Sequence, residues 1–133
     1  QHRLLLREGL LVAFFLAGLV VLGGQQEWWL APLVRTFGDR AAFYGALGLT
    51  AFVDNAALTY LATLVKGVGD GFQYAIVAGA AAGGGLTVIA NAPNPAGLAI
   101  LRRHFPDGAI NPGGLFLAAL LPTLLAVAAL RWL

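Results

Sequence analysis

Long stretches without a charged residue dominate this sequence. Residues 9–26, 71–101 and 108–130 contain no Asp, Glu, Lys or Arg, and residues 41–65 contain one, Asp54. Because about 20 apolar residues cross a bilayer as a helix, such blocks can enter a membrane. Hydrophobic residues make up 59% of the chain and charged residues 11%, against about a quarter charged in soluble domains. We therefore expect the chain to face lipid.

The remaining charges lie between these blocks or at their ends. The formal net charge of +2 could attract an anionic partner. However, the basic residues are scattered and not interleaved with aromatic ones, which favours membrane-flanking positions over nucleic-acid binding. The chain has no Cys, so disulfides and thiolate chemistry are excluded. The expected surroundings are a lipid bilayer, with no nucleic-acid partner.

The order of segments predicts an all-α membrane protein. Residues 9–26 are expected to form a transmembrane helix. Residues 27–37, which carry the adjacent Trp28 and Trp29, are expected to form a short helix at the level of the lipid headgroups. The sequence begins at Gln1 without an initiator methionine, and we expect it to be a piece of a longer protein.

Asp54 lies near the centre of an otherwise uncharged block. An Asp at the centre of a membrane helix costs about 3 kcal/mol, so we expect it to face protein or a water-filled cavity. Asn55, Thr59 and Thr63 follow on one helical face, although such threonines also suit interhelical hydrogen bonds. The block is either one span or two arms of about 18 Å meeting at Asp54 and Asn55. The plainer alternative is an Asp on a water-exposed turn.

Two prolines interrupt the longest uncharged block. Pro93 and Pro95 lack an N–H group, so the carbonyls of Ile89 and Asn91 are expected to lose their helical donors. Asn94 is predicted to cap the half-helix that follows, with Pro95 at its first position. Oxygen ligands at such a break suit a small cation such as sodium. An ordinary proline kink is the alternative.

Two strings resemble a known family. They are Phe-Val-Asp-Asn-Ala-Ala-Leu-Thr-Tyr-Leu at 52–61 and Gly-Gly-Gly-Leu-Thr-Val-Ile-Ala-Asn-Ala-Pro-Asn-Pro-Ala-Gly at 83–97. Both are similar to the putative sodium/proton antiporter family of the ion transporter superfamily. The resemblance extends over about 40–123 and includes Arg-Arg-His-Phe at 102–105. It implies one repeat of an inverted-repeat secondary transporter, with sodium held at the tips of a re-entrant helical hairpin and a broken helix.

The resemblance also implies an organisation in two units. Residues 1–40 would form a scaffold-type transmembrane helix plus the interfacial helix. Residues 41–133 would form a transport-type unit, with the hairpin at 41–65, the broken helix at 73–104 and the final transmembrane helix at 113–131. The chain would be the C-terminal repeat, with the missing N-terminal repeat of the same protein as its partner, and a homodimer is compatible with this. We expect an integral protein of a prokaryotic inner (plasma) membrane.

The activity expected from the resemblance is sodium/proton antiport. Relatives that carry dicarboxylates use a Ser-Asn-Thr motif at these tips, whereas this chain has Asp54-Asn55-Ala56. A carboxylate held in protein can exchange a proton for a cation, which favours antiport. Sodium is then a substrate, and no cofactor is expected. The expected cation- and proton-binding residues, the first four of them as sodium ligands, are Asp54, Asn55, Asn91, Asn94, Thr59 and Thr87.

Two other functions stay open at this stage. A sodium-coupled anion or metabolite carrier of the same superfamily would hold a negative group at the half-helix N-terminus beside Asn94 and Pro95. A non-catalytic structural subunit would pair Asp54 with an arginine of a partner. An enzyme is not expected, because one buried Asp among threonines supplies no set of nucleophile, base and metal ligands.

Overall fold

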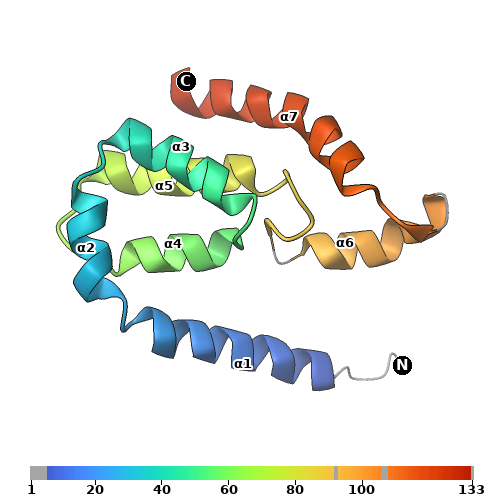
Figure 1. Cartoon of the computed structure of the whole chain (residues 1–133), viewed down its shortest axis with the longest axis horizontal. Helices are drawn as coiled ribbons and strands as arrows, with labels where there is room; N and C mark the ends of the chain where they lie inside the picture. Colours follow the sequence, from blue (N-terminus) through green and yellow to red (C-terminus); the bar gives the residue numbers. More distant parts are fainter. Residues whose placement is uncertain (1–5, 92, 106–107, 133) are drawn as a thin grey trace.

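The computed structural model describes residues 6–91, 93–105 and 108–132, and within these ranges the chain forms helices and no β-strand (Figure 1). The predicted all-α class is therefore confirmed. The helices are α1 (Leu6–Gly23), α2 (Glu27–Arg35), α3 (Asp39–Thr50), α4 (Asn55–Thr63), α5 (Asp70–Gly83), α6 (Asn94–Leu101), the short 3₁₀ helix η1 (Arg102–His104) and α7 (Pro112–Trp132).

The centre of the fold is the pair α3 and α5, which lie side by side (Figure 1). They touch through backbone, because a Cβ atom added at Gly79 would collide with the carbonyl oxygen of Phe43. A Cβ atom at Gly83 would lie 2.5 Å from the carbonyl oxygen of Leu47. Both contacts advance by four residues in the same direction, so the two helices run parallel. Small residues permit such an approach in membrane proteins, where close packing holds helices together.

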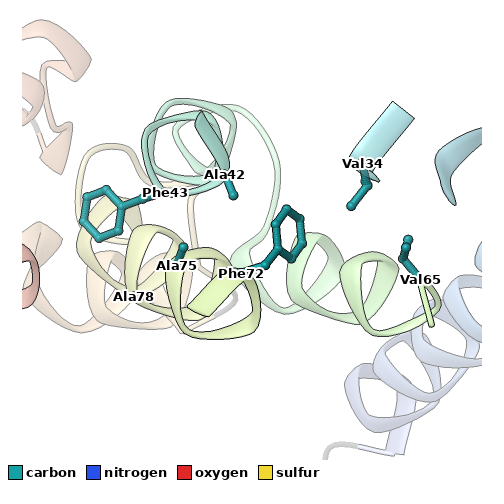
Figure 2. Close-up of a cluster of buried hydrophobic side chains, with 7 residues drawn as sticks. All are labelled: Val34, Ala42, Phe43, Val65, Phe72, Ala75 and Ala78. Carbon is teal, nitrogen blue, oxygen red and sulfur yellow. The ribbon is translucent and has the colours of Figure 1, made fainter. Parts of the chain in front are cut away.

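A cluster of buried apolar side chains holds the ends of several helices together. Figure 2 shows it drawn from α2, α3, α5 and the segment after α4. Phe43 of α3 is completely buried, and its ring also meets the ring of Tyr44 edge-on at 5.2 Å between centroids. The members of the cluster are Val34, Ala42, Phe43, Val65, Phe72, Ala75 and Ala78.

The segment 64–69 returns the chain from α4 to α5, and Figure 1 shows α4 beside these central helices. Gly67 in this turn has φ +78, a left-handed conformation that glycine adopts without steric cost. The guanidinium of Arg35 donates to the carbonyl oxygen of Lys66 at 3.1 Å and so ties α2 to the same turn. The acids Asp39 and Asp70 lie in the first turns of α3 and α5, where they interact favourably with the helix dipoles.

The last helix, α7, is attached to the central pair near its C-terminal end. The hydroxyl of Tyr74 donates to the carbonyl oxygen of Leu130 at 2.8 Å. The guanidinium of Arg131 lies 5.5 Å from the centre of the Phe43 ring, within the range of a cation–π contact. The rest of α7 is mostly exposed.

Within the described ranges, Pro112–Trp132 is the helix that is long and apolar enough to cross a membrane by itself. The pair Gly9–Gly23 and Glu27–Arg35 passes the same test together, but the two helices are bent by 73° at the break between them. The apolar residues of α1 are exposed along most of its length. On α2, Val34 is buried whereas Trp28 is 79% exposed.

We predict that Gly83→Ala destabilises the protein, because its methyl group would meet the backbone of α3. Overpacking of this kind costs about 1–3 kcal/mol. The measurement is thermal or denaturant unfolding of the full-length protein in detergent. Gly45→Ala on the exposed face of α3, with no atom within 4 Å of its added Cβ, is the matched control and should be neutral or stabilising. Equal effects of the two variants would contradict the close contact.

Candidate functional site

Two helix breaks lie against each other in this structure. The first separates α3 from α4 at residues 51–54, and the second separates α5 from α6 at residues 84–93. The hydroxyl of Thr87 donates to the carbonyl oxygen of Ala51 at 2.7 Å, and the backbone N–H of Asn55 donates to the carbonyl oxygen of Ala90 at 3.1 Å. These two hydrogen bonds join the breaks to each other.

Asp54 is the N-cap of α4 and is half-buried. Its Oδ1 atom accepts hydrogen bonds from the N–H groups of Ala56 at 2.9 Å and Ala57 at 3.2 Å. These bonds satisfy donors that a helix N-terminus otherwise leaves free, and the negative charge suits the positive end of the helix dipole. A carboxylate has a second oxygen, so it can hold the cap with one atom and meet a cation or a proton with the other.

Asn55 begins α4 directly beside the second break. Its Nδ2 atom lies 3.2 Å from the position that a Cβ atom on Gly84 would occupy. Because Gly84 has no side chain, there is room beside it for the Asn55 amide. Asn55 is half-buried, and its carbonyl oxygen accepts a hydrogen bond from the hydroxyl of Thr59 at 2.8 Å.

Asn94 differs from the prediction that it caps α6. The helix includes Asn94 as its first residue, Pro93 occupies the N-cap position, and no side chain caps the helix. The Asn94 side chain instead turns back, and its Nδ2 atom donates to the carbonyl oxygens of Gly84 and Thr87, both at 2.9 Å. The Thr87 carbonyl also accepts the backbone N–H of Ala90 at 3.4 Å, so the Asn94 amide adds a second, shorter hydrogen bond there. The amide oxygen of Asn94 is left to accept a hydrogen bond or a cation.

The Asn91 carbonyl has no helical donor, because the residue four positions later is Pro95, but it is not left unbonded. It accepts a hydrogen bond from the backbone N–H of Asn94 at 3.0 Å instead. Asn91 itself is half-buried, and the Ile89 side chain is exposed. The residue between Asn91 and Pro93 lies outside the described residues.

Three of the six residues expected to bind a cation are thus linked by hydrogen bonds between the breaks, namely Asn55, Thr87 and Asn94. Asp54 precedes Asn55 in the chain, and the hydrogen bonds of its side chain stay within α4. Thr59 lies one turn further along α4, and Asn91 lies in the unwound segment.

Sequence reasoning missed Gly84 and Ala90, which contribute backbone oxygens to this network. The run Gly83-Gly84-Gly85 was the only signal for Gly84 in the sequence.

The network contains both N–H groups that are already bonded and several oxygen atoms. The first three N–H groups of α4 all have acceptors. The Ala90 carbonyl accepts the first, and the Asp54 carboxylate accepts the other two. At the start of α6, Pro95 lacks an N–H and that of Asn94 is already bonded. Carboxylate, amide and hydroxyl oxygens are present at the breaks, and such hard ligands suit a small cation.

The structure described here gathers no three His, Cys, Asp or Glu side chains in positions that could hold a metal ion.

Comparison with known proteins identifies one family. A family model described as "Putative Na+/H+ antiporter" matches residues 1–133. No curated protein and no solved structure matches the chain.

We predict that Thr87→Val loosens the contact between the breaks. The variant leaves the buried carbonyl of Ala51 without its donor, which costs about 1–3 kcal/mol. Thr87→Ser keeps the hydroxyl and is the matched control. Unfolding of the full-length protein in detergent measures both, and an equal loss for the two variants would show that the hydrogen bond is unimportant.

Proposed function

We propose a function from one starting point: the chain belongs to the putative Na+/H+ antiporter family. Membership of an antiporter family implies an integral membrane protein. The proposed activity is secondary active transport, with sodium moving one way and protons the other. Its cation site lies where the break before α4 meets the break after α5.

The observation that carries this proposal is the position of Asp54. It is the one acidic residue within the four long apolar blocks, and it sits at the junction of the two breaks. A carboxylate at a helix break, next in the chain to the Asn55 amide, is a suitable place for sodium and a proton to compete. The proposed sodium ligands are Asp54, Asn55, Asn91 and Asn94. The hydroxyl oxygens of Thr59 and Thr87 are proposed to support them.

Exchange at this site conserves charge. Sodium binds the Asp54 carboxylate as the proton leaves it, so in either loaded form one monovalent cation is paired with one carboxylate and the net charge of the site is zero. A neutral site crosses a low-dielectric region at lower cost than a bare charge. The hydrogen bonds between the breaks let the α3–α4 arms and the α5–α6 arms move together as the site changes the side to which it opens.

The membrane arrangement that fits this activity has two parts. The arms α3 and α4 form a re-entrant hairpin, and α5 and α6 form a broken helix, because each arm is too short to cross a bilayer. The helices α1 and α2 belong to a scaffold, and α7 closes the transport unit. A second, inverted repeat of the same protein completes the site, within a prokaryotic inner membrane.

An anion or metabolite carrier is less well supported. Its ligand would need donors at a helix N-terminus. At α4 this position is already taken by the Asp54 carboxylate, and at α6 the cap residue and the second residue are both proline. Repulsion by Asp54 would further weaken the binding of an anion.

The decisive variant is Asp54→Asn in the full-length protein reconstituted into liposomes. Asn caps helices about as well as Asp, so α4 should stay folded while the exchangeable charge is lost. We expect sodium-driven proton flux to fall to the level of empty liposomes. Asp70→Asn, in the first turn of α5 and exposed, is the matched control and should retain flux. Unchanged flux in Asp54→Asn would disprove the assignment.

Sodium should also stabilise the protein in the absence of transport. A ligand at 100 times its dissociation constant adds about 2.7 kcal/mol to the free energy of unfolding. We expect sodium to raise the melting temperature of the parent protein and to have little effect on Asn94→Ala. Stabilisation by anions with no effect of sodium would instead support the carrier alternative.

A further inference from the structure

A cavity lies between α4 and α5, about one helical turn from the place where the two breaks meet. Its volume is about 170 Å³, enough for several water molecules, since each occupies about 30 Å³ in the liquid. Most of its wall is apolar, including the buried Val65 and Phe72. Three polar residues interrupt this wall, namely Thr59 and Thr63 from α4 and Gln73 from α5.

The two threonines of this cavity have their hydroxyl donors directed to backbone. The Thr59 hydroxyl donates to the carbonyl oxygen of Asn55 at 2.8 Å, and the Thr63 hydroxyl donates to that of Tyr60 at 2.6 Å. The Gln73 amide nitrogen reaches the carbonyl oxygen of Val68 at 3.4 Å. A hydroxyl that has used its hydrogen presents oxygen lone pairs to its surroundings, and the Gln73 amide still carries its carbonyl oxygen and a second N–H. The cavity therefore offers acceptors, which suit cations and water.

Thr59 and Thr63 lie on the same side of α4 as Asn55, the residue that contacts the second break. Asn55, Thr59 and Thr63 are four residues apart, so they share one face of α4. Thr63 and Gln73 are exposed, whereas Thr59 is half-buried. The lining of the cavity therefore includes exposed residues beside the turn 64–69 and extends to Thr59, one turn of α4 from Asn55. The opposite face of α4 packs on α1, where Leu61 lies 3.2 Å from the position of a Cβ atom on Gly23.

We propose that this cavity is the route by which hydrated monovalent cations and protons reach Asp54 from the side of the membrane at which the turn 64–69 lies. The exposed charge of Lys66 keeps that end in water. Water fills the cavity, and the oxygens of Thr63, Gln73 and Thr59 replace part of the hydration shell of sodium in that order. This proposal rests on the proposed function, because a route is needed only if the cation binds at Asp54.

Cysteine accessibility tests the route. The sequence has no Cys, so Thr59→Cys, Thr63→Cys and Gln73→Cys each introduce a single thiol into this chain. Leu61→Cys on the opposite face of α4 is the matched control. The full-length variants, with any cysteine elsewhere removed, are reconstituted into liposomes and treated from either side with a small cationic methanethiosulfonate. A thiol reacts only where water reaches it and it can ionise.

We expect all three cavity thiols to react from the same side of the membrane, about tenfold or more faster than the Leu61→Cys thiol. Sodium should slow the reaction of Thr59→Cys, the innermost position. Equal rates at Leu61→Cys, or no reaction of the cavity thiols from either side, would overturn the proposal and indicate that lipid chains or another helix fill the cavity. Gln73→Cys replaces an exposed side chain, so it keeps the test valid if a threonine variant misfolds.

The failure of this proposal is distinguishable from failure of the cation site. If Asp54→Asn retains sodium-driven proton flux, the proposed function is wrong whatever the labelling shows. If Asp54→Asn loses flux but the cavity thiols do not react, the site stands and the route is wrong. Labelling of the cavity thiols in the Asp54→Asn background should persist and lose its dependence on sodium.

Discussion

The close backbone contact between α3 and α5 is the constraint on which the rest of the structure depends. Gly79 and Gly83 bring α5 against the carbonyl oxygens of Phe43 and Leu47. The Thr87 hydroxyl then reaches the carbonyl oxygen of Ala51 at the same spacing, one turn further on. The register of the two helices therefore continues into the breaks, and it determines which residues of the two unwound segments meet.

The same contact explains how an Asp can lie in so apolar a chain. At the end of the parallel pair the chain leaves α3, and Asp54 begins α4 as its cap. Its charge is balanced by two N–H groups and by the positive end of a short helix. The second break supplies an acceptor for Asn55 and places the Asn94 amide across two carbonyls. Polar groups thus satisfy one another where lipid could not.

Part of this site was predictable because its causes are local. An acid in an apolar block and a proline-rich interruption each indicate a break in a helix, and Asn55, Thr59 and Thr63 share a face by spacing alone. The role of Asn94 was not predictable. Local preference places Asn at a helix cap, but here its amide bonds the carbonyl oxygens of Gly84 and Thr87, ten and seven residues earlier in the chain.

The sequence by itself determined that the chain is helical and apolar and that its single mid-block charge is Asp54, because hydrophobicity, charge and proline act through neighbouring residues. Only the tertiary structure decided that the two breaks touch, that Gly84 and Ala90 join the network, and that a cavity lined by Thr63 and Gln73 lies below it. These features depend on how α3, α4 and α5 pack, and packing joins residues whose separation along the chain carries no local signal.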